Sequence, residues 1–161
     1  MSYDTGGEIR DDAYSQIKNG SWKNSIKEAD IVIVGVSRTS KSPTSVYLSC
    51  RGYKVANIPF VSMETIPSSL FEIKKPLIVG LIINPEKLAQ IRQSRLTSIG
   101  QEVSNNYVEI ESIKEEVAES RKLFNRLNCP VIDVTKRSVE ETSAKIIQLL
   151  QEKKLKEKSF N

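Results

Sequence analysis

Two runs of the sequence are apolar throughout, and they constrain the fold more than any other feature of the chain. Residues 31–34 are Ile-Val-Ile-Val, and residues 77–83 are Leu-Ile-Val-Gly-Leu-Ile-Ile. A strand with one face in water alternates apolar and polar side chains, whereas a strand covered on both faces does not. Both runs are therefore predicted to be strands that are buried on both faces.

The segments around these runs alternate between helical and strand-like patterns. Ser42-Pro43 predicts the start of a helix and Gly52 the position after its end, because Ser caps helices, Pro suits the first helical position and Gly follows the last. Further strands are predicted at residues 53–58 and 130–134, and further helices at residues 85–98, 106–128 and 138–150. This alternation predicts one α/β domain, with a mostly parallel sheet flanked by helices.

Composition limits both the size and the chemistry of this domain. The chain has 161 residues, enough for one hydrophobic core, and no histidine. Residues 1–29 are interpreted as a lead-in segment, residues 30–150 as the domain and residues 151–161 as a charged, flexible tail. Ser-His-Asp and Cys-His nucleophile pairs, His-ligated zinc and an imidazole general base are excluded within the chain. Any catalysis must use carboxylates, lysine, arginine, hydroxyls and backbone amides.

Cysteine usage and hydropathy bear on where the protein works. Cys50 and Cys129 lie far apart, and no signal peptide follows Met1. This pattern is typical of the reducing cytoplasm, where each thiol is expected to be a small buried apolar side chain. No apolar run approaches the roughly 20 residues of a membrane helix, and the net charge is +4. We expect a cytoplasmic protein that binds neither membranes nor nucleic acid.

The segment after the first predicted strand resembles a phosphate-binding loop. It fits the pattern Gly-x-x-x-x-Gly-Lys-(Ser/Thr) at Gly35, Lys41 and Ser42, but Ser40 replaces the second glycine. In parallel sheets ligands bind at the carboxyl ends of strands, where loop amides and a helix N-terminus attract phosphate. Lys41 would reach the outer phosphates, Ser42 would ligate Mg²⁺ and Arg38 would bind phosphate through two donors. The alternative is a Ser/Thr-rich turn with a surface lysine and an N-capping serine.

Three stretches of the sequence resemble the family of regulatory proteins of pyruvate, phosphate dikinase and of phosphoenolpyruvate synthase. They are residues 30–61, DIVIVGVSRTSKSPTSVYLSCRGYKVANIPFV, residues 80–96, GLIINPEKLAQIRQSRL, and residues 130–146, PVIDVTKRSVEETSAKI. The family's loop typically reads GVSRT-(Ser/Gly)-K-T-P, so Ser40 is one of its variants and Ser42 keeps the hydroxyl of the usual threonine. The resemblance implies a P-loop-containing, kinase-like fold.

The resemblance also implies an unusual pair of reactions. Members of the family use ADP as the donor to phosphorylate a threonine of the dikinase or the synthase, which inactivates that enzyme. They remove the phosphate by attack of inorganic phosphate, which releases pyrophosphate. Carried over to this chain, Lys41 would contact the transferred β-phosphate, and ADP with Mg²⁺ would be bound by Gly35, Val36, Ser37, Arg38, Thr39, Ser40, Lys41 and Ser42. The short connection between Phe60 and Pro76 favours the dikinase as target, and the family implies a homodimer.

Other candidate residues lie outside the loop. Asp133 ends a predicted strand, where a carboxylate would hold Mg²⁺ or its waters, or would accept the threonine proton; alternatively it caps the loop near Thr135. Arg92 and Arg95 are predicted to share a helix face. Together with Arg137, they would clamp phosphate or pyrophosphate, or else form a solvated surface.

The first residues are similar to a further element of the family. Tyr3-Asp4-Thr5-Gly6 resembles its Tyr-Asp-Asp-Gly form, with Thr5 in place of the second acid and Asp4 as a candidate catalytic proton acceptor. Because members are nearly twice as long, the chain is expected to correspond to their C-terminal half, with residues 1–29 as a linker remnant. Two other functions stay open: a small-metabolite kinase that uses ATP, and an ADP-binding module without full activity.

Overall fold

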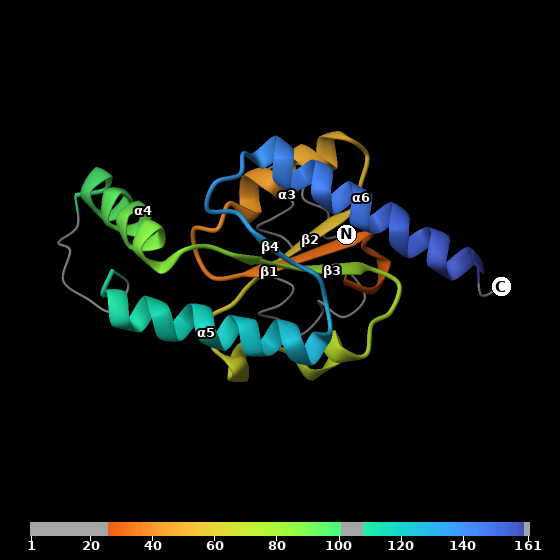
Figure 1. Ribbon diagram of the computed structural model, residues 1–161, viewed down its shortest axis with the longest axis horizontal. Helices are drawn as coiled ribbons and strands as arrows, with labels where there is room; N and C mark the ends of the chain where they lie inside the picture. Colours follow the sequence, from red (N-terminus) through yellow and green to blue (C-terminus); the bar gives the residue numbers. More distant parts are fainter. Residues whose placement is uncertain (1–25, 101–107, 160–161) are drawn as a thin grey trace.

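The computed structural model describes residues 26–100 and 108–159 of the chain (Figure 1). In these residues, four strands form one parallel sheet in the order β2-β1-β3-β4. The strands are β1 (Ile31–Gly35), β2 (Val55–Pro59), β3 (Leu77–Ile82) and β4 (Val131–Asp133). The helices are α3 (Lys41–Cys50), α4 (Pro85–Ser98), α5 (Ile110–Leu127) and α6 (Val139–Ser159), with short 3₁₀ turns η1 (Met63–Thr65) and η2 (Ser68–Phe71) between β2 and β3. The predicted α/β fold with a parallel sheet flanked by helices is confirmed.

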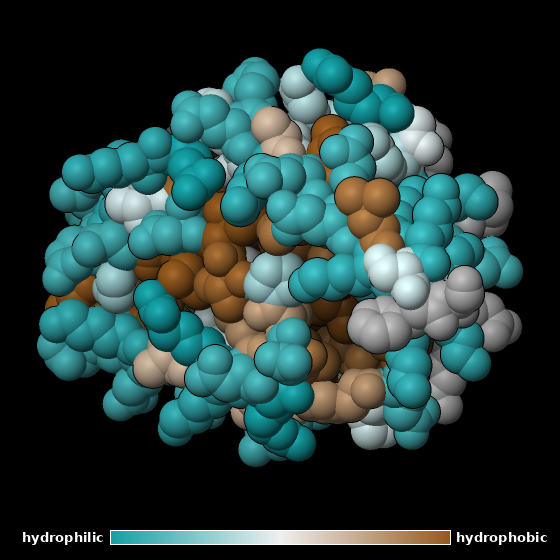
Figure 2. All heavy atoms as spheres, turned by 45° about the vertical axis from the view of Figure 1, so that its right-hand side comes forward, coloured by the Kyte–Doolittle hydropathy of each residue, from teal (hydrophilic) through white to brown (hydrophobic). Residues whose placement is uncertain are grey.

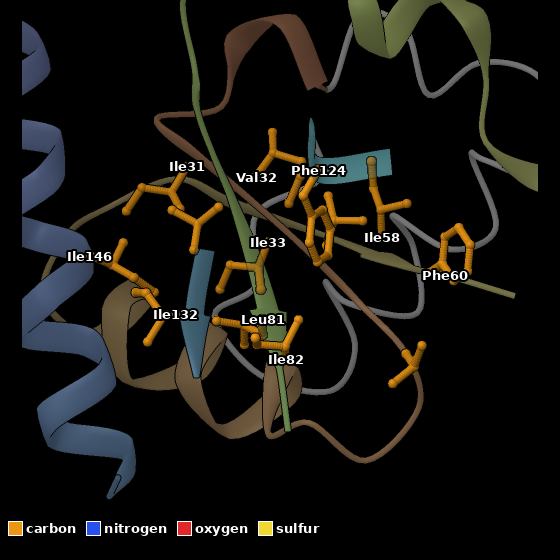
Figure 3. Packing of buried hydrophobic residues seen from close by; sticks show 14 of the residues in the cluster. Ile31, Val32, Ile33, Ile58, Phe60, Leu81, Ile82, Phe124, Ile132 and Ile146 are labelled. Atoms are coloured by element: carbon orange, nitrogen blue, oxygen red, sulfur yellow. The ribbon is translucent and has the colours of Figure 1, made fainter. Parts of the chain in front are cut away.

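The apolar strands are buried because helices cover both faces of the sheet. Strand β1 pairs with β2 and with β3, so Gly35 lies opposite Pro59 on one side and Leu81 on the other. Helices α3 and α6 pack together on one face, and α5 covers the other (Figure 1). Figure 3 shows Phe124 of α5 and Ile146 of α6 among the buried side chains of the strands. Burial of each large apolar side chain stabilises the fold by about 1.5–3 kcal/mol.

A glycine inside β3 lets α5 approach the sheet closely. A Cβ atom at Gly80 would lie 2.6 Å from ring carbons of Phe124. Any larger residue at this position would therefore push α5 away from the sheet or displace the Phe124 ring. The glycine in an otherwise apolar run is explained by this packing contact.

The prediction that Ser42 caps α3 is wrong. The helix begins at Lys41, and its N-cap is Ser40, whose φ of 64° is left-handed. Pro43 is consequently the third helical residue, a position that it tolerates because the first N–H groups of a helix have no acceptor within it. At the other end, Gly52 follows the helix with a φ of 92°, as predicted.

The predicted starts of α4 and α6 are confirmed by their capping hydrogen bonds. The Oδ1 atom of Asn84 accepts from the N–H of Lys87 at 3.0 Å. The Oγ atom of Ser138 accepts from the N–H of Glu141 at 3.1 Å. Figure 1 shows that α4 lies beyond the carboxyl end of β3, so this helix can form a wall of any site at that edge.

Helix α6 is longer than the sequence predicts. It continues to Ser159, where the sequence predicts a flexible tail after residue 150. Its last turns are held by Lys153, whose ammonium donates to the carbonyl oxygens of Lys74 and Lys75 at 2.5 and 3.0 Å. Within residues 26–100 and 108–159, no helix is both long and apolar enough to cross a membrane. Hydrophilic side chains surround a central hydrophobic band on the face shown in Figure 2.

The two cysteines differ in burial, which corrects the expectation that both are buried. Cys50 is exposed because it is the last residue of α3 and lies outside the face that the helix buries. Cys129 is half-buried just before β4, and this burial raises the pKa of its thiol to about 11. Neither thiol forms a disulfide.

Candidate functional site

A cavity of about 680 Å³ opens at the carboxyl ends of β1 and β2. Its walls come from the loop after β1, the first turn of α3, the end of β2 and the exposed face of α4. The lining residues are Ser37, Arg38, Ser40, Lys41, Ser42, Pro43, Asn57, Pro59, Ile91 and Arg95. Of the loop residues predicted to bind nucleotide, Gly35, Val36 and Thr39 do not line the cavity, because they are buried beneath the loop surface.

The backbone of this loop follows a tight path. A Cβ atom at Gly35 would lie 2.9 Å from the Oγ1 atom of Thr39 and 3.0 Å from the carbonyl oxygen of Leu81, so only glycine fits without movement. Arg38 and Ser40 have φ values of 68° and 64°, in the left-handed region that glycine enters easily. Ser40 therefore adopts the conformation for which the phosphate-loop pattern has glycine, at a strain of about 1–2 kcal/mol.

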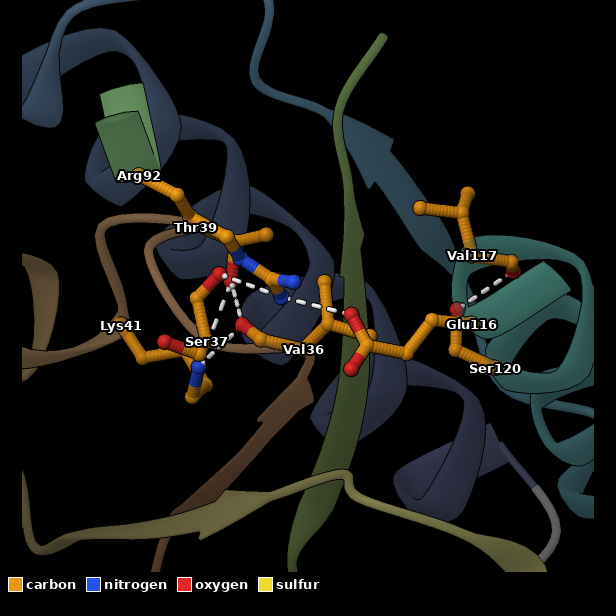
Figure 4. Close-up of polar contacts among 8 residues, drawn as sticks. All are labelled: Val36, Ser37, Thr39, Lys41, Arg92, Glu116, Val117 and Ser120. Atoms are coloured by element: carbon orange, nitrogen blue, oxygen red, sulfur yellow. Dashed lines mark hydrogen bonds and ion pairs between the residues drawn. The ribbon is translucent and has the colours of Figure 1, made fainter. Parts of the chain in front are cut away.

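Lys41 is enclosed by the loop that precedes it (Figure 4). The residue is only 8% exposed, and its Nζ donates to the carbonyl oxygen of Val36 at 2.6 Å and to the Oγ1 atom of Thr39 at 3.4 Å. Burial, together with the positive charges of Arg92 and Arg38, lowers the pKa of Lys41 to about 7. The alternative interpretation is therefore wrong in placing Lys41 on the surface.

The structure separates the two arginines of α4. Arg95 lines the cavity, where its charge adds to those of Arg38 and Lys41. Arg92 does not line it and is only 1% exposed. Its Nη2 donates to the Oε2 atom of Glu116 on α5 at 2.6 Å and to the carbonyl oxygen of Ser37 at 3.2 Å (Figure 4). The described contacts of Arg92 are thus with the loop after β1 and with α5. Of these two arginines of α4, only Arg95 lines the cavity.

Asp133 makes the contacts that a loop cap makes. Its Oδ1 atom accepts from the N–H of Thr135 at 2.9 Å and from the Thr135 hydroxyl at 2.5 Å. Although partial burial opposes the effect, these hydrogen bonds, helped by the charges of Arg121 and Arg137, keep the pKa of Asp133 below its usual value. Asp133 and Arg137 are both exposed, and neither lines the cavity.

Of the two predicted Mg²⁺ ligands, only one lies at the cavity. Ser42 lines the cavity, whereas Asp133 does not. Among residues 26–100 and 108–159, acidic and cysteine side chains form no cluster of three or more that could hold a metal ion. Mg²⁺ commonly binds through few protein ligands together with phosphate oxygens and water, which is the arrangement that Ser42 permits. Asp4 lies outside the described residues.

Asn57 and Glu116 belong to the site but escape sequence reasoning. Asn57 is 9% exposed in the middle of β2 and lines the cavity. Its signal is a polar residue inside a strand that is otherwise apolar. Glu116 has no comparable signal, because it is one of several glutamates on a helix surface and is distinguished only by its contact with Arg92.

Comparison with known proteins decides the family. The sequence model described as kinase/pyrophosphorylase matches residues 15–147. The chain belongs to the kinase/pyrophosphorylase family. The resemblance drawn from the loop and the two later stretches is thereby confirmed.

Relatives in this family carry the name pyruvate, phosphate dikinase regulatory protein. One from Erythrobacter litoralis is 52% identical over 132 residues, which cover 82% of this chain and 47% of the relative. One from Maricaulis maris is 45% identical over 141 residues, covering 88% of this chain and 50% of the relative. One from Caulobacter vibrioides is 48% identical over 132 residues, covering 82% of this chain and 42% of the relative. The chain thus spans about half the length of the curated relatives it matches.

Proposed function

We propose that this chain transfers the β-phosphoryl group of ADP to a threonine of pyruvate, phosphate dikinase and removes it again with inorganic phosphate. The observation that carries the proposal is the buried ammonium of Lys41, enclosed by a strained loop that opens on a cavity. The names of the relatives favour the dikinase over phosphoenolpyruvate synthase as the target. The activity is proposed for the cytoplasm, as the sequence predicts.

The charges around the cavity suit a nucleoside diphosphate. Three cationic side chains, Arg38, Lys41 and Arg95, line it, and no carboxylate is among its described lining residues. The ammonium of Lys41 has three N–H donors, and the described contacts with Val36 and Thr39 use two of them. The third is available to a phosphate oxygen. A bound phosphate would also raise the pKa of Lys41 and keep the lysine charged.

Both proposed reactions transfer one phosphoryl group through the same charged surroundings. In the forward direction the threonine oxygen attacks the β-phosphorus, the bond to the bridging oxygen breaks, AMP leaves and the hydroxyl proton passes to a base. In the dephosphorylation an oxygen of inorganic phosphate attacks the phosphorus of the phosphothreonine, and the bond between that phosphorus and the threonine oxygen breaks. The proton of the attacking phosphate passes to the threonine oxygen, so that pyrophosphate leaves and the threonine side chain is restored. Mg²⁺, held by Ser42 and phosphate oxygens, would supply further positive charge.

The residues of this chain would contribute mainly position and charge. Lys41, Arg38 and Arg95 would stabilise the negative charge on the transferred group, a role that accounts for much of the rate in phosphoryl transfer. Asp133 and Asp4 remain the candidates for the proton acceptor. Because the carboxylate of Asp133 already accepts two hydrogen bonds from Thr135, it would act only after that turn rearranges.

The test is to incubate the chain with Mg²⁺, the dikinase and ADP labelled on its β-phosphate, and to measure labelled phosphothreonine. Transfer is expected with the wild-type chain and is expected to be lost in Lys41→Ala. Lys87→Ala is the matched control, because Lys87 is an exposed lysine of α4 that does not line the cavity.

Three outcomes would contradict the proposal. Transfer from ATP alone to small acceptors would indicate a metabolite kinase. Tight ADP binding without transfer to any protein would indicate a binding module. Transfer to phosphoenolpyruvate synthase but not to the dikinase would reassign the target while leaving the chemistry intact.

A further inference from the structure

The guanidinium of Arg92 is placed where it can control one peptide group of the loop. Arg92 belongs to α4 and lies 55 residues after Ser37 in the sequence. Its Nη2 nevertheless donates to the carbonyl oxygen of Ser37. The same Nη2 donates to Glu116 of α5. One buried nitrogen therefore ties two helices to the peptide that joins Ser37 to Arg38 (Figure 4).

The direction of this carbonyl fixes the direction of the next N–H. No peptide bond of the described residues is cis, and in a planar trans peptide the C=O and the N–H point in opposite directions. Arg92 is 1% exposed and lies on the buried side of the loop. When the Ser37 carbonyl points to Arg92, the N–H of Arg38 points away from Arg92, and both residues of this peptide line the cavity.

We propose that Arg92 is a positioning residue that, with Glu116, holds the Ser37–Arg38 peptide so that the Arg38 N–H is offered to a phosphoryl group in the cavity. The inference deepens the proposed function, on which it rests for the identity of the ligand. If the peptide flipped, the Ser37 carbonyl oxygen would face the phosphate instead, and a donor would be replaced by a repelling acceptor.

The pairing with Glu116 explains how a buried arginine can serve in this way. A buried charge without a partner is strongly destabilising, and a carboxylate at 2.6 Å offsets that penalty. Because the side chain of Glu116 is 29% exposed, the pair is only partly enclosed. The left-handed φ of 68° at Arg38 is a second sign that this peptide is held by its surroundings, since a residue with a Cβ atom does not adopt it without strain.

The test separates positioning from simple packing by means of a double variant of the full chain. Arg92→Met leaves Glu116 without its partner and is expected to lose both thermal stability and ligand affinity. Arg92→Met/Glu116→Met removes both charges together, a change that is often neutral for stability. We expect this double variant to regain the thermal midpoint while its dissociation constants for pyrophosphate and ADP stay raised about tenfold or more, the effect of losing one hydrogen bond to a charged group.

A control and a direct readout complete the design. Lys122→Met/Glu119→Met removes an exposed ion pair of the same helix, with an N–O distance of 2.9 Å, and is expected to change neither stability nor affinity appreciably. In NMR spectra of the wild-type chain, addition of pyrophosphate is expected to shift the Arg38 amide proton downfield, as hydrogen bonding to an anion does. The shift is expected to be lost in Arg92→Met/Glu116→Met.

The inference is overturned if pyrophosphate does not bind the wild-type chain, if it binds without moving the Arg38 amide, or if the double variant binds it as tightly as the wild type. A pyrophosphate-induced shift in a chain that shows no phosphotransfer would contradict the proposed function and would still support the positioning role. The two ideas therefore fail on different measurements.

Discussion

The loops after β1 and β4 begin alike but satisfy their polar groups in different ways. Each leaves the carboxyl end of a parallel strand, carries hydroxyl and charged side chains, and leads into a helix. After β4, Asp133 accepts both of its hydrogen bonds from Thr135, only two residues away. After β1, the chain encloses a buried lysine ammonium, and two residues with side chains, Arg38 and Ser40, have left-handed backbones.

The difference shows how a capped turn is distinguished from a candidate binding loop. In the loop after β4, the Asp133 carboxylate is satisfied within the turn by Thr135, whose hydroxyl also accepts from the N–H of Asn84 at 2.9 Å. The loop after β1 contains a desolvated charge and strained backbone, which persist only where the surrounding structure holds them and which are typical of ligand sites. A polar residue at the end of a parallel strand is therefore weak evidence of a site until its partners are known.

The largest expected effect comes from removing the lysine of the first loop. Lys41→Ala is expected to lower the rate of phosphoryl transfer from ADP by about 10²–10³-fold, because it removes a positive charge aimed at the transferred group. The matching change in the other loop, Lys136→Ala, removes an exposed lysine and is expected to leave the rate within about twofold. Equal losses in the two variants would break the contrast between the loops. Initial rates with labelled ADP measure both.

The next effect is a dependence of stability on pH above about 7, which comes from Lys41 in the loop after β1. The pKa of Lys41 is about 7 in the folded chain against 10.5 for an ordinary lysine, so the unfolded chain binds the extra proton between these values. The free energy of unfolding should rise as the pH increases through this window, and below it the penalty of the buried charge is complete. Urea unfolding of the wild type and of Lys41→Met measures this effect. Between pH 7 and 10.5, the free energy of unfolding of the wild type should increase by up to a few kcal/mol relative to that of the variant. A pH-independent difference would contradict the burial of the charge.

A smaller effect is expected from relieving the strain at Ser40. Ser40→Gly should raise the free energy of unfolding by about 1 kcal/mol, because glycine adopts a φ of 64° without a steric penalty. Lys136→Gly in the loop after β4, where no left-handed residue is described, should instead lower stability, because glycine adds entropy to the unfolded chain. Thermal or urea unfolding gives both values. A destabilised Ser40→Gly would show that the serine hydroxyl matters more than the backbone.

The smallest effect is expected at Asp133. Asp133→Ala removes two hydrogen bonds from an exposed turn and should lower stability by less than about 1 kcal/mol, with ADP affinity unchanged when Mg²⁺ is absent. The contribution should be present above the usual carboxyl pKa and should disappear as the pH falls through the lowered pKa of Asp133. A large loss of transfer in the presence of Mg²⁺, with stability intact, would favour the predicted catalytic or metal-binding role.

The predictable parts of the molecule are those governed by neighbours in sequence. The apolar run at residues 31–34 became the fully buried β1, and Asn84 capped α4 as its spacing before Pro85 indicates. The predicted cap of α3 was wrong because Ser40, which has a left-handed backbone, is the N-cap. The helix therefore begins earlier than the Ser42-Pro43 pattern suggests. The predicted end of α6 was wrong because Lys153 donates to the carbonyl oxygens of Lys74 and Lys75, which lie 79 and 78 residues earlier in the sequence.

For this chain, local patterning was sufficient to predict the α/β fold, the edge of the sheet at which the cavity opens and the loop from Gly35 to Ser42. Those features depend on apolar periodicity, caps and glycine spacing, which act over a few residues. Which charges face the cavity depended instead on packing between distant elements. Arg92 and Arg95 look equivalent along one helix, but contact between α4 and α5 buries the first against Glu116 and leaves the second at the cavity. Such pairing depends on distances across the fold, and no local pattern encodes them.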